Sequence, residues 1–140
     1  IYLFNKRNVR LPLFEAFDQP DTLNSCADRP VSTFAPQALI LMNGPFVQEQ
    51  GRTLAVALVK ARADTAKQLD ALYRRTLGRA PRAEEVKLAT EFLDAQAETI
   101  RGRLQDGQPI GLDPKSLPPG TDAARVRALA DLCVVVFNTH

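Results

Sequence analysis

Residues 65–105 read TAKQLDALYRRTLGRAPRAEEVKLATEFLDAQAETIRGRLQ. The first part has the i, i+3, i+4, i+7, i+8 spacing of one helix face, with Leu69, Leu72, Tyr73, Thr76 and Leu77 at those positions. Gly78 is suited to end this helix in the left-handed conformation. The turn 78–81 then leads to the longest predicted helix, over about 82–105. Its inward stripe is predicted to be Val86, Ala89, Leu93, Ala97, Ile100 and Leu104.

Helices are also predicted before this segment. Residues 11–17 favour one short helix, with Pro12 tolerated near its start. Residues 33–42, with Ser32 or Thr33 as N-cap, are apolar around nearly the whole helix, which predicts a central, buried element. The sequence 43–45, Asn-Gly-Pro, should end that helix and begin another that runs to about residue 61. The face of this next helix is predicted to carry Phe46, Val47, Gln50, Leu54, Ala57 and Leu58.

The C-terminal part of the chain predicts a Pro- and Gly-rich loop followed by one more helix. The loop, 106–120, should be ordered only where it is packed or bound. The last helix should start at Thr121 or Asp122, although residues 134–137 are apolar enough for a strand. Its buried residues are predicted to be Val126, Leu129, Ala130, Cys133, Val136 and Phe137. The whole pattern predicts an all-α fold: five or six helices in an irregular orthogonal bundle, one domain over 1–140, with residues 1–4 open to a short extended segment.

Charge and hydropathy exclude two classes of partner. Eighteen Lys and Arg residues face sixteen Asp and Glu residues, and the net charge of +2 is spread evenly along the chain. This balance argues against a dedicated nucleic-acid surface. We expect no membrane span, because no apolar run approaches the roughly 18 residues that one needs. The basic residues Lys6, Arg7 and Arg10 near two aromatics, and the cluster Arg74, Arg75, Arg79 and Arg82, are interpreted as solvated edges, the latter balanced by Asp70, Glu84 and Glu85.

The cysteine and histidine counts exclude several kinds of site. The chain contains Cys26, Cys133 and a single histidine, His140. Three scattered ligands do not form a structural zinc site, and the chain has no CxxCH for a c-type haem. We therefore predict no catalytic residue, no metal site and no cofactor within these residues. Cys133 is predicted to be buried and unpaired, while a bond to Cys26 would require the two Cα atoms to lie within about 7 Å.

Residues 18–29 form a long polar loop, and long loops in small domains are often functional. Its side chains could bind a ligand or a hard cation, although the spacing does not match an EF-hand. The alternative is that these side chains cap the turns of their own loop, with Arg29 pairing with Asp18 or Asp21 to hold it closed. The candidate ligand-binding residues are Asp18, Asp21, Cys26, Asp28 and Arg29.

Several segments, in this order, resemble the PSD domain, a C-terminal domain of unknown function in planctomycete cytochrome-associated proteins. They are FDQPD at 17–21, Cys26, Arg29, VST at 31–33, QAL at 37–39, MNGPFV at 42–47, LYRRTLGRAP at 72–81, DLC at 131–133 and FN at 137–138. Arg82 departs from the pattern, because the family often has a Thr or Ser helix cap there. The resemblance implies that these residues are the C-terminal portion of a larger, exported multidomain protein, located in the periplasm or at the cell surface. A c-type haem is then expected in an upstream domain.

Three hypotheses for function follow. The leading one is a non-catalytic helical module that packs on an upstream domain of the same chain or on a partner; it predicts an exposed apolar patch. The second is part of a polysaccharide-binding or polysaccharide-degrading protein whose cleft uses the loop 18–29. The third is a docking module beside a c-type cytochrome domain. The residues themselves favour the first and do not favour an enzyme.

Overall fold

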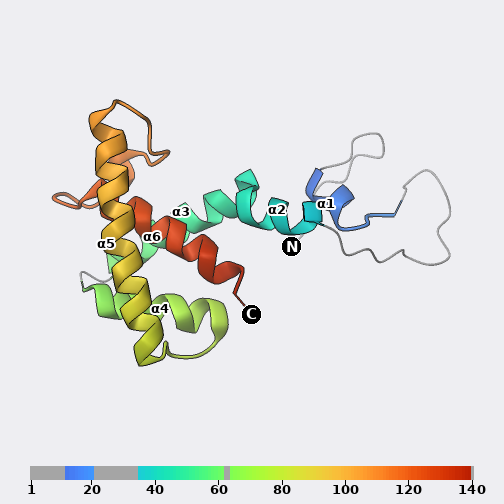
Figure 1. Cartoon of the computed structure of the whole chain (residues 1–140), viewed down its shortest axis with the longest axis horizontal. Helices are drawn as coiled ribbons and strands as arrows, with labels where there is room; N and C mark the ends of the chain where they lie inside the picture. Colours follow the sequence, from blue (N-terminus) through green and yellow to red (C-terminus); the bar gives the residue numbers. More distant parts are fainter. Residues whose placement is uncertain (1–11, 21–34, 62–63, 140) are drawn as a thin grey trace. The chain divides into compact units, whose positions relative to one another are not determined.

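A computed structural model of the protein describes residues 12–20, 35–61 and 64–139 (Figure 1). The predictions for residues 1–4, for the N-cap at Ser32 or Thr33 and for most of the loop 18–29 lie outside these ranges. The described part is all-helical and contains no strand, which confirms the predicted fold class. A 3-10 helix, Pro114–Ser116, interrupts the last loop. The α-helices are α1 (Pro12–Ala16), α2 (Ala35–Asn43), α3 (Pro45–Ala61), α4 (Thr65–Leu77), α5 (Ala83–Gln105) and α6 (Ala123–Phe137).

The chain divides into two units, Ile1–Gly44 and Pro45–His140. The predicted single domain over 1–140 therefore stays a prediction. In the first unit, the Gln37 side chain donates a hydrogen bond to the carbonyl of Ala16, at 3.0 Å, and so ties α2 to α1. The predicted burial of α2 is wrong, because none of its residues is buried and Leu39 is 57% exposed. Apolar residues all around a helix show that the helix has no polar face, but they do not show that another part of the protein covers it.

The junction between α2 and α3 follows the sequence prediction. The helix α2 ends at Asn43 and α3 begins at Pro45. Gly44 donates its N–H to the carbonyl of Ile40, at 2.8 Å, and a Cβ at this position would lie only 2.4 Å from that oxygen. Gly44 is required for this close approach, and its φ is not positive, so it does not end α2 in the left-handed conformation.

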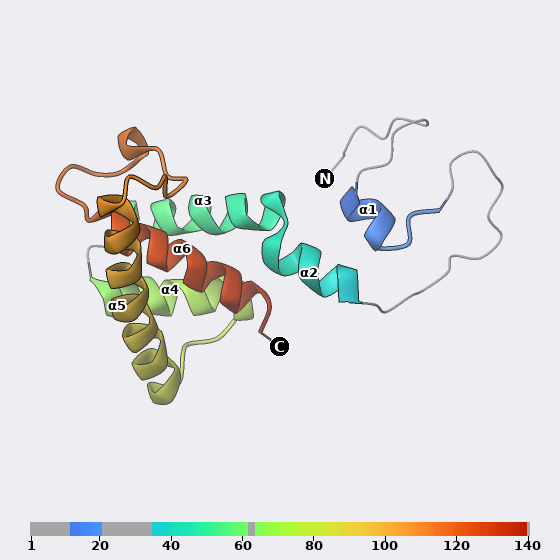
Figure 2. The same cartoon turned by 45° about the horizontal axis from the view of Figure 1, so that its top comes forward.

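The core of the second unit is built around α6, which packs against α3, α5 and α4. Figure 2 shows α6 running between α3 and α4, with α5 crossing it. The predicted strand alternative for residues 134–137 is wrong, since α6 continues to Phe137. Five of its six predicted core residues are buried and Phe137 is half-buried. On α4, Leu69, Leu72 and Tyr73 are buried, and Gly78 ends the helix at a φ of 70°, as expected.

The buried face of α3 agrees with the predicted face only in part: Leu58 is buried as predicted and Leu54 packs half-buried against the core. Its buried residues are Gly51, Ala55 and Leu58, whereas Phe46 is 61% exposed. Gln50 and Ala57 are also exposed. At Gly51, a Cβ would lie 2.7 Å from Val134 Cγ2 and 3.0 Å from the carbonyl oxygen of Ala130, both on α6. The helices meet at the smallest residues of α3, and a pattern that counts large apolar side chains misses such a contact.

The helix α5 buries Ala89, Leu93, Ala97 and Ile100, but its predicted inward residue Leu104 is 41% exposed. At 1.5 Å per residue, α5 is about 34 Å long and α6 about 22 Å, so α6 cannot cover the whole of α5. The loop 106–120 is packed, as predicted for an ordered loop. Its contacts to the core are made by Ile110, Leu112 and Leu117.

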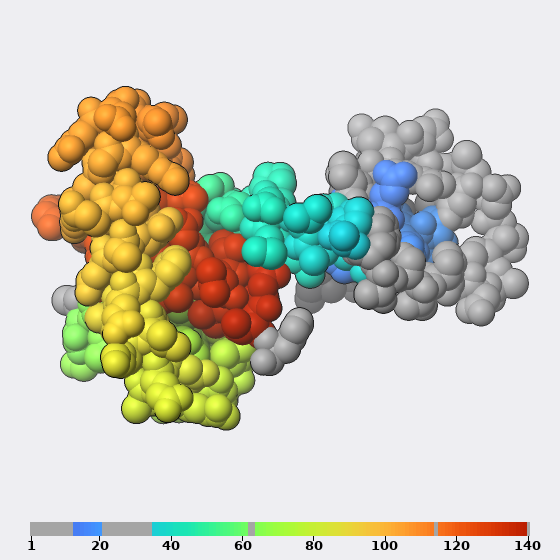
Figure 3. All heavy atoms as spheres, in the orientation of Figure 1, coloured from blue at the N-terminus to red at the C-terminus, as the bar shows by residue number. Residues whose placement is uncertain are grey.

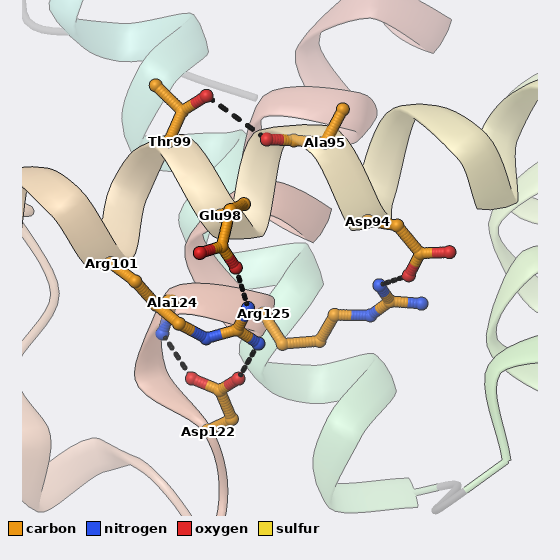
Figure 4. Close-up of polar contacts among 8 residues, drawn as sticks. All are labelled: Asp94, Ala95, Glu98, Thr99, Arg101, Asp122, Ala124 and Arg125. Atoms are coloured by element: carbon orange, nitrogen blue, oxygen red, sulfur yellow. Dashed lines mark hydrogen bonds and ion pairs between the residues drawn. The ribbon is translucent and has the colours of Figure 1, made fainter.

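A polar network joins α5 to the start of α6 (Figure 4). Asp122 caps α6 by accepting the N–H of Ala124, at 2.9 Å, and pairs with Arg101 of α5, at 2.6 Å. Arg101 also pairs with Glu98, and Arg125 of α6 pairs with Asp94. Burial alone would raise the pKa of Asp122, but Arg101 and the backbone N–H donors outweigh it and lower that pKa. The network fixes the start of α6 against the side of α5.

Candidate functional site

Of the five candidate ligand-binding residues in the loop 18–29, the structure describes only Asp18. Asp18 follows α1 with a φ of 56°, is half-buried and donates its N–H to the carbonyl of Glu15, at 3.3 Å. The other candidates, Asp21, Cys26, Asp28 and Arg29, lie outside the described residues. The ligand-binding role of this loop therefore stays a prediction.

A groove of about 610 Å³ lies in the second unit, lined by α4, α5 and α6 and the turn between α4 and α5. Figure 3 shows atoms of α5, α6 and this turn next to one another on one face. We call it the α4–α5–α6 groove. It has an apolar wall, formed chiefly by Leu88, Phe92, Leu132 and Val135, and a polar end, formed by Tyr73, Arg79, Arg82 and Glu85.

The apolar wall exposes two large side chains from different helices. Leu88 of α5 is 65% exposed and Val135 of α6 is 49% exposed, while Phe92 is half-buried and Leu132 is buried. Single exposed apolar residues are ordinary on a protein surface, but these two line the same hollow. In the sequence, Leu88 directly precedes the inward residue Ala89, and Val135 directly precedes the inward residue Val136. A large apolar residue just outside the inward stripe of each helix was the sequence signal for this exposed pair.

The polar end is organised by one carboxylate. Arg79 donates through both terminal nitrogens to Glu85, with Nη1–Oε2 and Nη2–Oε1 distances of 2.7 and 2.6 Å. Glu85 Oε2 also accepts the backbone N–H of Arg82, at 2.7 Å. The Arg79 guanidinium lies 5.7 Å from the centre of the Tyr73 ring, which is within the range of a cation–π contact. Glu85 thus fixes Arg79 and the start of α5 together.

Arg82 begins α5 at the N-cap position. A guanidinium has no hydrogen-bond acceptor, so it cannot cap a helix as Thr or Ser would. The weak cap expected at this position is confirmed, and the carboxylate of Glu85 partly compensates by accepting the N–H of Arg82. The Arg82 side chain is exposed and forms no ion pair with any residue in the described part of the chain. Asp70, which was also predicted to balance the basic cluster, forms an ion pair with Arg74.

Glu85, Arg79 and Tyr73 keep their ordinary charge states near neutral pH. Hydrogen bonds from the Arg79 side chain and the Arg82 backbone lower the pKa of Glu85 to about 2. The hydrogen bond to Glu85 raises the pKa of Arg79. Burial, followed by the charge of Glu85, raises the pKa of Tyr73. These groups therefore keep a fixed pattern of charges at the groove. General acid–base catalysis, in contrast, uses groups whose pKa lies near the working pH.

The loss of folding stability at low pH should depend on the protonation of Glu85. Because its pKa is lower in the folded state than its ordinary 4.5, its contribution is present above about pH 4.5 and is lost as the pH falls toward 2. We expect the wild type to be more stable than Glu85→Gln at pH 7 and the difference to vanish near pH 2. Urea unfolding at successive pH values measures this difference. Glu84→Gln, in the same helical turn, is the control, and an equal pH-dependent loss there would contradict the role of Glu85.

Two further features of the described residues bear on chemistry. Cys133 is free and buried, as predicted, and burial raises the pKa of its thiol to about 12, so it is not a reactive nucleophile. Within the described ranges, no group of three or more His, Cys, Asp or Glu side chains is placed to hold a metal ion. No helix of the described part is long and apolar enough to cross a membrane.

The described part of the chain is all-helical, and its groove combines an apolar wall with a polar end. Residues 1–93 of the 140 match the family model PSD1, described as a protein of unknown function (DUF1553). Since the match covers more than half of the chain, the chain belongs to this family. The match includes the polar end of the groove and Leu88, but α6 lies beyond it. No curated protein and no solved structure matches the chain.

Proposed function

We propose that the chain is a non-catalytic helical module of an exported multidomain protein, and that it packs on an upstream domain or a partner protein through the α4–α5–α6 groove. The observation that carries this proposal is the pair of exposed side chains Leu88 and Val135, which come from two helices and line one hollow. Fully burying a leucine or valine side chain is favourable by about 1.5–3 kcal/mol, so covering both would contribute substantially to association.

The polar end supports docking over catalysis. Glu85 is held by Arg79 and by the Arg82 backbone, and neither Arg79 nor Tyr73 titrates near neutral pH. A preformed charge pattern beside an apolar wall is the usual arrangement of a protein contact surface, with a polar rim around an apolar centre. The exported location in this proposal follows from the family resemblance. The polysaccharide alternative depends on the loop 18–29, where replacing Asp18 and Asp21 by asparagine is the decisive change.

Site-specific photo-crosslinking tests the proposal. A benzophenone amino acid is placed at Leu88 or Val135 in the full-length protein produced in its native cells, and cross-linked peptides are identified by mass spectrometry. We expect both positions to link to the same polypeptide segment, either upstream in the chain or in one partner. Leu104 is the matched control, since it is 41% exposed on α5 but does not line the groove. Cross-links no more frequent than at Leu104 would refute the docking role.

A further inference from the structure

We infer that the occupant of the α4–α5–α6 groove is an amphipathic α-helix of about three turns, with apolar residues on the face that meets Leu88 and Val135 and a carboxylate at the end that meets Arg82. This inference rests on the proposed function and specifies the chemistry of the partner. Three observations carry it: the length of the groove along α5, its apolar wall, and the unbalanced charge at its polar end.

The length and the wall favour a helix. The α5 residues that line the groove run from Arg82 through Leu88 to Phe92, a distance of about 15 Å along the helix axis, which equals nearly three turns. An extended peptide would place unpaired backbone N–H and C=O groups against the apolar wall, and the groove borders no strand that could pair with them. A helix satisfies these groups internally and presents side chains at i, i+3, i+4 and i+7.

The charge at the polar end favours a carboxylate. Arg79, Arg82 and Glu85 together carry a net charge of +1, because the charge of Glu85 is matched by Arg79 through two hydrogen bonds. Arg82 supplies the surplus charge, with an exposed side chain that pairs with no carboxylate of the described residues. A partner carboxylate at this end would gain a charge-assisted contact, whereas a lysine or arginine would be repelled.

Two synthetic helical peptides of 14 residues test the inference. Both carry the same leucine face, and they differ only at the ends, with glutamates at both ends of one and lysines at both ends of the other, so the binding direction does not matter. Binding to the whole 140-residue chain is measured by fluorescence anisotropy. We expect the glutamate peptide to bind about fivefold more tightly, the size of an exposed ion pair, and this preference to shrink at high salt.

Charge reversal provides the decisive comparison. Arg82→Glu should reverse the preference in favour of the lysine peptide, while Arg75→Glu, which changes an exposed arginine that does not line the groove, should leave it unchanged. Leu88→Asp should abolish binding of both peptides, and circular dichroism checks that each variant is folded. Equal binding of both peptides, binding of neither, or self-association of the chain that Leu88→Asp removes would overturn the inference. Cross-links at Leu88 and Val135 would in those cases still support the proposed function.

Discussion

Leu93→Ala should lower the free energy of unfolding by about 3 kcal/mol, within the range measured for leucine truncation in protein cores. Leu93 lies in the middle of α5 and is almost fully buried in the core of the second unit. The loss combines the transfer of the removed carbon atoms with a cavity that α6 and its neighbours cannot fill. Urea unfolding followed by circular dichroism measures it, provided that the transition is a single cooperative step.

Leu88→Ala is the matched control for this prediction. It makes the same chemical change five residues earlier on the same helix, but the side chain is 65% exposed. We expect its free energy of unfolding to change by no more than about 0.5 kcal/mol. A loss comparable to that of Leu93→Ala would show that Leu88 is part of the core, and would remove the apolar wall on which the proposed docking depends.

Gly51→Val should destabilise the second unit by about 3 kcal/mol, near the upper end of typical overpacking costs. Its Cβ would meet Val134 Cγ2 at 2.7 Å and the Ala130 carbonyl oxygen at 3.0 Å. The carbonyl belongs to the backbone of α6, so relief would require α3 and α6 to move apart. Thermal unfolding of the variant and the wild type measures the loss.

Gly102→Ala is the control for this second substitution. Gly102 is also inside a helix, but a Cβ there would meet nothing within 4 Å. Alanine costs less backbone entropy than glycine in a helix, so we expect a gain of about 0.5–1 kcal/mol. The two glycines should therefore respond with opposite signs. If Gly51→Val were as stable as the wild type, the close contact between α3 and α6 would be contradicted.

The helix boundaries were predictable because local signals set them. Gly78 ends α4 in the left-handed conformation, Pro45 begins α3, and Asp122 caps α6 through its own side chain. These effects act over one turn and need no knowledge of the remaining fold. The inward faces of α4 and α6 were also predictable, since their large apolar residues recur at helical spacing and face one core.

The tertiary contacts were harder to predict because they depend on what each helix meets. The face of α3 follows from Gly51 and Ala55, whose small side chains carry little hydrophobic signal, and not from Phe46. The apolar residues of α2 predicted burial, yet none is buried. The spacing of apolar residues shows which face of a helix is apolar, whereas the burial of that face depends on another element packing against it.

The candidate site was predictable only in its charges. Composition predicted that Asp70, Glu84 and Glu85 balance the basic turn, and Asp70 and Glu85 do form ion pairs there, but the groove itself was not predicted. Leu88 and Val135 lie on different helices and are almost fifty residues apart in sequence, so no local pattern links them. Sequence patterns instead favour the loop 18–29, because a run of polar residues in a long loop can be recognised without knowing the fold.

The central position of α6 also sets how the protein can be divided and made. The family match ends at residue 93, thirty residues before α6 begins. A recombinant piece cut at that point would retain α3 and α4 but lose the helix that fills the space beside Gly51, Ala55 and Leu58. During synthesis, α3 likewise leaves the ribosome well before its packing partner α6 has been made, so its apolar face stays uncovered by α6 until residues 123–137 are synthesised. The homologous segment and the folding unit are thus different stretches of chain.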